Sequence, residues 1–88
     1  MRGLALGVVF LSVAAVSAAD RYPAASGGDI EITPVIHSSV QLEHGGVVIH
    51  VDPWSAGDLS AGKPADLILI TDTPVHHLDV AAIKRLRK

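Results

Sequence analysis

A run of four apolar residues, Leu67–Ile70, constrains the fold of this chain more than any other feature. Four consecutive apolar side chains favour a strand covered on both faces, because a half-exposed strand alternates apolar and polar residues. The run ends at Thr71 and is followed by Asp72, His76 and His77, all of which can ligate a metal. We therefore expect a buried strand with candidate ligands at its carboxyl end, where α/β proteins build binding sites.

Residues 1–18 have the three parts of a secretory signal peptide. Arg2 provides a positive start, Leu4–Val16 is apolar, and Val16-Ser17-Ala18 offers the small residues of a cleavage site. The apolar run is shorter than the roughly 20 residues that cross a bilayer, so export is favoured over an uncleaved membrane anchor. We expect a mature chain of residues 19–88 that is periplasmic or secreted and has no stable membrane anchor.

The composition of the mature chain limits how it can be stabilised and what it can bind. It is close to the lower size limit for an independent core, and it has no cysteine. It therefore forms no disulfide, and any zinc site must use nitrogen and oxygen ligands. The whole sequence has 7 basic and 9 acidic side chains, a net charge of −2 with neutral histidines. This balance gives no electrostatic basis for binding nucleic acid.

Sequence patterns predict a strand-rich first half. Residues 19–28, rich in Pro, Ala, Ser and Gly, are expected to form a flexible linker. Period-two alternation predicts a strand from residue 29 that ends at Pro34 or lies at a sheet edge. A second strand at 39–43 and a third at 47–51 flank Gly45-Gly46, which predicts a hairpin.

The end of the chain has the pattern of a helix. Asp79 is a good N-cap for a helix over 80–88, in which Val80, Ile83 and Leu86 can share one face. The last turn is basic, which complements the negative end of the helix dipole. A solvated helix end is the preferred interpretation of this cluster over a phosphate or membrane patch; its members are Lys84, Arg85, Arg87 and Lys88.

Taken in order, these elements resemble the N-terminal part of the metallo-β-lactamase-fold hydrolases. The resemblance spans 30–88, through Ile-Thr-Pro-Val-Ile-His-Ser-Ser at 32–39, Leu-Glu-His-Gly-Gly at 42–46, Val-Asp-Pro at 51–53, Ala-Asp-Leu-Ile-Leu-Ile-Thr-Asp at 65–72 and His-Leu-Asp at 77–79. It implies an α/β fold, the N-terminal half of an αβ/βα sandwich with a hairpin-rich sheet and one C-terminal helix, in a truncated domain over residues 29–88. It also implies metal-dependent hydrolysis of a small-molecule ester, lactone, amide or phosphoester, with zinc as the expected metal.

The family's ligand motif is Thr-His-x-His-x-Asp-His, and many relatives have Asp in place of the first His. In this chain Thr71 opens the motif, Asp72 takes the first ligand position and His77 takes the last. Pro74 stands where the second His belongs and has no ligating atom, while His76 replaces the Asp. The resemblance thus implies an incomplete metal site of Asp72, His76 and His77. We expect little or no hydrolysis by this chain alone and assign no catalytic residue.

These residues also have simpler interpretations. Asp72 can cap a turn through its side chain, and His76-His77 can be a polar loop. Asp52 resembles a buried structural Asp of the family, but a turn-forming role is favoured. Trp54 is more typical of a side chain that covers a small core than of a substrate contact. The remaining histidines, His37, His44 and His50, show no ligand spacing with one another. His50 is expected to point outwards from its strand.

A second class of function is compatible with the same sequence. The chain can be a small exported domain without catalytic activity that pairs with a partner through an open sheet edge. Unpaired strand edges accept additional strands from other chains.

Overall fold

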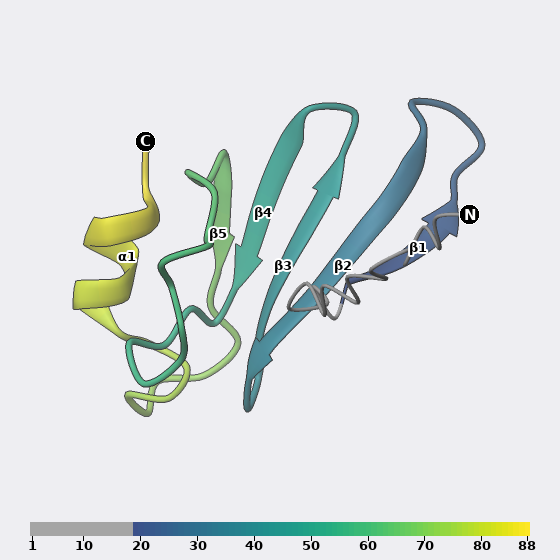
Figure 1. Cartoon of the computed structure of the whole chain (residues 1–88). Coiled ribbons are helices and arrows are strands. Elements are labelled where there is room, and N and C mark those ends of the chain that lie inside the picture. The colour runs from purple at the N-terminus through teal and green to yellow at the C-terminus, as the bar shows by residue number, and fades with distance from the viewer. Residues whose placement is uncertain (1–18) are drawn as a thin grey trace, which may run out of the picture.

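The computed structural model describes residues 19–88, so the predicted signal peptide lies outside the described residues. Five strands form one mixed sheet in the order β1-β2-β3-β4-β5, and a short helix follows the last strand (Figure 1). The pairs β1–β2, β2–β3 and β3–β4 are antiparallel, whereas β5 is parallel to β4. No helix within the described residues is long and apolar enough to cross a membrane. The elements are β1 Asp20–Pro23, β2 Asp29–Ile36, β3 Ser39–His44, β4 Val47–Val51, β5 Leu67–Leu69 and α1 Val80–Leu86.

Tight turns connect the central strands, and the hairpin predicted at Gly45-Gly46 is confirmed. These glycines have φ angles of 56° and 81°, and a type I′ turn needs positive φ at both central positions. The turn between β2 and β3 contains His37, which has a φ of 53°. Because β3 is antiparallel to β2 and β4, and β5 is parallel to β4, the C-terminal ends of β2, β4 and β5 share one edge of the sheet.

The first two strands differ from the sequence-based prediction. β2 is an internal strand that continues through Pro34 to Ile36, with a register shift after the proline. Within residues 19–88 the pairing of β1 extends only as far as Ile32, so no hydrogen bond to a described residue of β1 is lost through the missing N–H of Pro34. β1 itself lies within residues 19–28, which were expected to be a flexible linker, and is ordered by its pairing with β2.

The helix α1 begins where the sequence predicted. Oδ1 of its N-cap, Asp79, accepts hydrogen bonds from the N–H groups of Ala81 and Ala82 at 3.0 and 3.3 Å. The helix ends at Leu86 rather than continuing to Lys88.

The packed side of α1 contains Leu86, as predicted, but differs from the prediction at Val80. Ala82 and Leu86 are buried and pack with Leu59 against Ile68 of β5. Val80 is 58% exposed, so the predicted face containing Val80 is wrong. Residues four positions apart lie one above the other on a helix, which places Ala82 and Leu86 together against the sheet.

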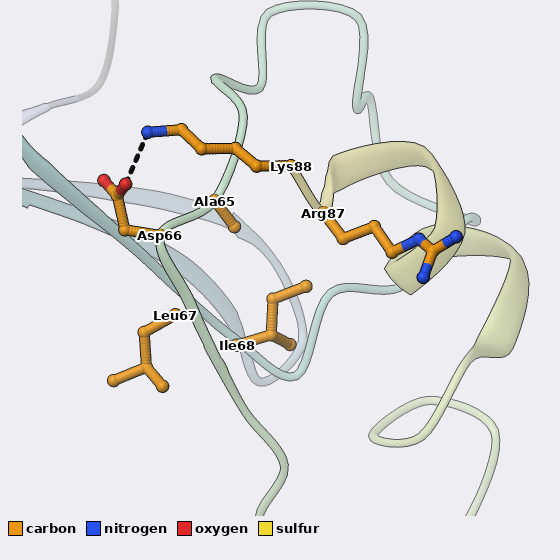
Figure 2. Close-up of a pocket in the computed structure, with 6 residues that line it drawn as sticks. All are labelled: Ala65, Asp66, Leu67, Ile68, Arg87 and Lys88. Carbon is orange, nitrogen blue, oxygen red and sulfur yellow. Dashed lines mark hydrogen bonds and ion pairs between the residues drawn. The ribbon is translucent and has the colours of Figure 1, made fainter.

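The chain returns to the sheet after α1, beside the start of β5. The N–H of Ala65 donates to the carbonyl oxygen of Leu86 at 2.7 Å, and Ala65 forms a parallel bridge with Arg87. Lys88 forms an ion pair with Asp66, and these residues help to line an open pocket of about 350 Å³ (Figure 2). This pocket lies at the N-terminal end of β5, whereas the candidate ligands follow the C-terminal end.

The two faces of the sheet differ in polarity, and α1 lies on the more polar one. Ser39, Gln41 and His50 are buried on this face. His50, predicted to point outwards, lies beneath the 59–63 segment, where its Nε2 is 2.8 Å from the carbonyl oxygen of Lys63. That prediction was wrong because the face of β4 that contains His50, its one polar residue, lies under the 59–63 segment and not towards solvent.

The opposite face is apolar. Residues paired across β2, β3, β4 and β5 form two rows on it: Ile32, Leu42, Ile49 and Leu67, and then Pro34, Val40, Val51 and Leu69. Among the described residues no helix or second sheet packs on these rows, and Leu67 and Leu69 are 46% and 45% exposed. The sequence predicted that β5 is covered on both faces. The described part of the chain covers it on one face only, because α1 and the 59–63 segment lie on the same side.

Candidate metal centre

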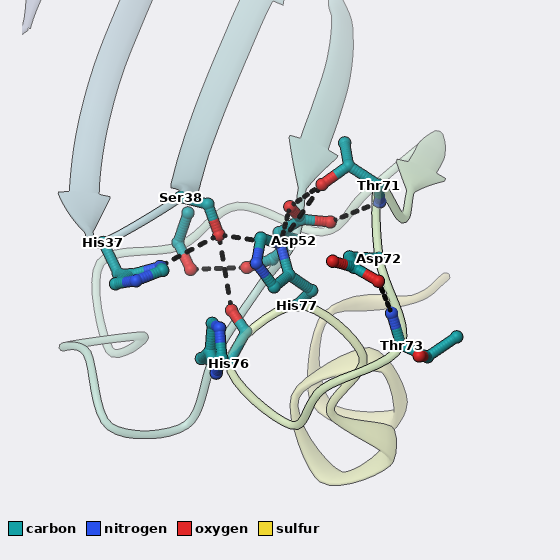
Figure 3. A network of polar contacts seen from close by, with 9 residues as sticks. His37, Ser38, Asp52, Thr71, Asp72, Thr73, His76 and His77 are labelled. Carbon is teal, nitrogen blue, oxygen red and sulfur yellow. Dashed lines mark hydrogen bonds and ion pairs between the residues drawn. The ribbon is translucent and has the colours of Figure 1, made fainter.

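A network of polar side chains occupies the sheet edge where β2, β4 and β5 end (Figure 3). Asp52 directly follows β4, Thr71 lies just beyond β5, and the turn after β2 contains His37 and Ser38. His77 comes from the loop between β5 and α1. The strand directions alone bring these distant parts of the sequence together.

Asp52 is fully buried at the centre of this network. Its Oδ1 accepts a hydrogen bond from the backbone N–H of Thr71 at 2.7 Å, and its Oδ2 accepts one from the Thr71 hydroxyl. Oδ2 also lies 2.7 Å from Nδ1 of His77. Burial raises the pKa of the Asp52 carboxyl, but the hydrogen bonds from Thr71 and His77 outweigh it and lower the pKa from 3.8 to about 2. Asp52 is therefore ionised at neutral pH.

This position combines the two roles considered for Asp52 from the sequence. Its φ of 46° is a turn conformation, which the sequence favoured. Its side chain, however, links the end of β4 to Thr71 after β5 and to the histidine loop. The structural role is thus the larger one, because both carboxylate oxygens are used by partners distant in sequence.

The contact with Asp52 determines which nitrogen of His77 carries a proton. An ionised carboxylate can only accept, so Nδ1 of His77 is the donor, and in the neutral ring the lone pair is on Nε2. Nδ1 also lies 3.2 Å from the hydroxyl oxygens of Ser38 and Thr71. Ser38, His77 and Asp52 do not form a nucleophilic triad, since a triad needs serine and aspartate at opposite ring nitrogens. Orientation by a carboxylate is instead typical of a histidine that binds a metal.

Three histidines meet beside this carboxylate. Ligand nitrogens of His37, His76 and His77 all lie within 4.8 Å of one another. The ring centroids of His37 and His76 are 4.6 Å apart, and those of His76 and His77 are 4.5 Å apart. Trp54 stands edge-on to His37 and His76, with ring centroids 6.1 Å from each. Imidazole nitrogens grouped in this way are suited to a transition metal.

The structure brings His76 and His77 together but places Asp72 differently. The Asp72 side chain is exposed, and its Oδ1 accepts a hydrogen bond from the N–H of Thr73 at 2.8 Å. It does not belong to the group of neighbouring ligand atoms found among the described residues. This contact is to the adjacent residue and is not that of a turn cap, so turn capping and metal ligation by Asp72 both remain predictions.

Sequence reasoning missed His37, because its distance along the chain from His76 and His77 hides their proximity. One signal was available. His37-Ser38 separates two alternating runs, so it can form a tight turn, and the turn after β2 lies at the same edge as the end of β4. His44 and His50, which were not assigned to a site, lie outside the cluster.

A solved structure is similar to this chain. It is the crystal structure of a protein from Parabacteroides distasonis ATCC 8503 that is provisionally named a metal-dependent hydrolase, matched with a TM-score of 0.74 and 37% sequence identity. The match covers 80% of this chain and 32% of that chain, so this chain spans about a third of the matched protein's length. No protein-family model and no curated protein matches the chain.

The fold and the site are both consistent with part of a metal-dependent hydrolase structure. A five-stranded mixed sheet with one C-terminal helix covers part of a structure named as a metal-dependent hydrolase, and three histidines cluster at the sheet edge. The resemblance noted in the sequence is supported to this extent.

Proposed function

We propose that this chain is the N-terminal, metal-binding part of an exported hydrolase of the metallo-β-lactamase superfamily, with zinc as its metal. The observation that supports this most is the His77 ring, which the buried Asp52 carboxylate orients at 2.7 Å beside two further histidines. The similarity to a structure named as a metal-dependent hydrolase points the same way. In a complete site the metal would lower the pKa of a bound water so that it can attack a small-molecule substrate.

We further propose that this chain alone hydrolyses little or no substrate. Pro74 has no ligating atom at the motif's second histidine position, and His76 takes the place of the carboxylate. The histidine cluster contains no carboxylate that could accept a proton from water. Asp52 cannot serve, because it is fully buried and hydrogen-bonded to Thr71 and His77.

The uncovered apolar face supports the proposed αβ/βα sandwich. The two rows of apolar side chains across β2 to β5 are suited to packing against another layer, since sheets bury an apolar face against a second element. In the proposed architecture that layer is the second sheet of the sandwich. On the polar face, α1 and Leu59 pack against Ile68 of β5.

Zinc binding and hydrolysis by the full chain test this proposal directly. We expect zinc to bind, and hydrolysis of 4-nitrophenyl acetate to be no faster with zinc than after chelation. Failure to bind zinc would refute the metal-binding function. Stoichiometric zinc with chelator-sensitive turnover would refute the expected inactivity.

The motif alignment has its own test, in a chain carrying Pro74→His and His76→Asp. If Asp72 and His77 occupy family ligand positions, restoring the two altered positions should raise the affinity for zinc steeply. An unchanged affinity would count against the alignment. Export is tested by sequencing the N-terminus of the secreted or periplasmic product, which we expect to begin at Ala19.

A second candidate function is supported by β5, the last strand of the sheet. Its Leu67 and Leu69 are nearly half exposed, and Ile70 beyond it is 37% exposed. A non-catalytic domain could pair here with a strand of another chain. A second copy of this chain can serve as the partner in a test. Analytical sedimentation should show self-association that Leu69→Lys weakens. A chain that stays monomeric at all concentrations would argue against self-pairing.

A further inference from the structure

We propose that His37, His76 and His77 together form a three-imidazole site for one divalent metal of the zinc or copper type. This inference rests on the proposed metal-binding function and deepens it, because it replaces Asp72 with His37 in the ligand set. His37 comes from the turn after β2, and the other two come from the loop after β5.

The distances suit one metal ion. A tetrahedral zinc with bonds of about 2.0–2.1 Å to imidazole nitrogens holds those nitrogens about 3.4 Å apart. The three ligand nitrogens lie within 4.8 Å of one another, so the rings must close by at most about 1.4 Å. Side-chain rotation can supply a movement of this size because His37 is exposed and the other two rings are half-buried. Three protein ligands leave a fourth position for water or another molecule.

Two of the three rings are oriented so that Nε2 is available. Nδ1 of His77 donates to the Asp52 carboxylate at 2.7 Å, which leaves the lone pair on Nε2. Nδ1 of His37 lies 3.3 Å from the Ser38 hydroxyl oxygen. The same hydroxyl donates to the carbonyl oxygen of His76 at 3.4 Å, so its lone pairs can accept the Nδ1–H of His37. Ser38 is thus a positioning residue that contacts all three histidines.

The backbone at the site supports a role for the His37 side chain. Among the described residues, the non-glycine residues with positive φ are His37 at 53° and Asp52 at 46°. A left-handed conformation is unfavourable for a residue with a Cβ, and glycine would avoid that cost. Both strained residues belong to the same side-chain network, and strain of this kind is concentrated at functional sites.

The donor set predicts which metals bind. Three neutral imidazoles without a carboxylate favour Zn²⁺, Cu²⁺, Ni²⁺ or Co²⁺ over Mg²⁺, Ca²⁺ and Mn²⁺, which prefer oxygen ligands. Cu²⁺ should bind more tightly than Zn²⁺, as it does at most nitrogen sites. The Trp54 ring flanks His37 and His76, so it shields the group on one side.

Trp54 is the only tryptophan of the chain and provides a direct readout. Paramagnetic Cu²⁺ quenches indole fluorescence at short range, and the Trp54 centroid is 6.1 Å from those of His37 and His76. We expect one equivalent of Cu²⁺ to quench the fluorescence of the full chain. An excess of Zn²⁺ should restore the fluorescence by competition, and millimolar Mg²⁺ should not. Equal competition by Mg²⁺ would overturn the proposed donor set.

The decisive variant is His37→Gly, because glycine adopts the positive φ without strain and the fold should be kept. Loss of a residue that hydrogen-bonds to a metal ligand typically weakens metal binding by roughly 10–100-fold. Loss of His37, a direct ligand, should weaken Cu²⁺ binding by at least that much. The melting temperature, measured with chelator present, should stay the same or rise. His44→Asn is the matched control, since His44 lies at the other end of β3 and bonds to the carbonyl oxygen of Ser26 at 2.7 Å.

The outcomes separate this inference from the proposed function. Wild-type affinity in His37→Gly, together with lost binding in His77→Asn, would overturn the three-imidazole set and leave metal binding in place. No binding of Cu²⁺ or Zn²⁺ by the wild type would overturn both. Weakened binding in His37→Gly with an unchanged His44→Asn would support the proposed ligands.

Discussion

Replacing Asp52 with asparagine tests how the candidate metal centre is held together. Asparagine keeps the shape of the side chain but removes its charge. Its amide oxygen can still accept from the N–H of Thr71, as Oδ1 of Asp52 does at 2.7 Å. Its NH₂ group would then face Nδ1 of His77, which would have to become the acceptor, so that the ring proton moves to Nε2.

The pKa of Asp52 sets the size of the effect. Its pKa falls from 3.8 to about 2 on folding, which corresponds to about 2 kcal/mol of stability for a carboxylate with 1% side-chain exposure. Because the folded pKa is the lower one, this stabilisation is complete above about pH 5 and is lost as the pH falls from 3.8 towards 2. About half of it should remain at pH 3.

Urea unfolding with a chelator present measures the prediction without any contribution from metal. Asp52→Asn should lower the free energy of unfolding by about 2 kcal/mol at pH 7 and by about half as much at pH 3. Nitrogen NMR of the His77 ring should show the proton on Nδ1 in the wild type and on Nε2 in the variant. Asp72→Asn is the control, since Asp72 is exposed and should change stability by less than about 0.5 kcal/mol.

Two results would refute this reasoning. One is an Asp52→Asn chain as stable as the wild type at pH 7. The other is a stability difference of the same size at pH 7 and pH 3, since that would show that the charge of Asp52 is not what stabilises the fold.

Two further substitutions test the packing that supports the site. Asp79→Ala removes the acceptor for the N–H groups of Ala81 and Ala82 and for the N–H of Ser55, which lies at 2.8 Å. Urea unfolding should show that the free energy of unfolding falls by about 1–2 kcal/mol, and Asp79→Asn should recover much of it. Gly62→Ala would place a Cβ 2.9 Å from Cδ2 of Leu86 and 3.1 Å from the Leu59 carbonyl oxygen, so we expect a loss of about 1–3 kcal/mol. An unchanged melting temperature in Gly62→Ala would contradict this close approach of loop and helix.

Local features of the fold could be predicted from the sequence. Gly45-Gly46 identified the β3–β4 hairpin because both turn positions need positive φ, and Asp79 identified the start of α1 because its side chain caps the first turn. Pro34 misled the prediction for β2. A proline disturbs a sheet only where its missing N–H would have had a partner, and the described pairing of β1 with β2 stops at Ile32, before Pro34.

The candidate site could be predicted only in part. The sequence singled out Asp72, His76 and His77 because they follow an apolar strand, and it considered Asp52 as a structural residue. It could not give the burial of Asp52 or its hydrogen bond to His77, since those depend on the ends of β4 and β5 lying side by side.

The sequence by itself determined strands β2 to β5, the hairpin, the helix cap and the presence of a ligand loop after β5. These features depend on residues a few positions apart, whose backbone preferences and hydrogen bonds act locally. Only the tertiary structure decided that His37 joins His76 and His77. It also decided that α1 packs at β5 on the polar side of the sheet and leaves the apolar rows uncovered by the described residues. Those outcomes depend on strand order and direction, which bring together side chains that the linear sequence keeps far apart.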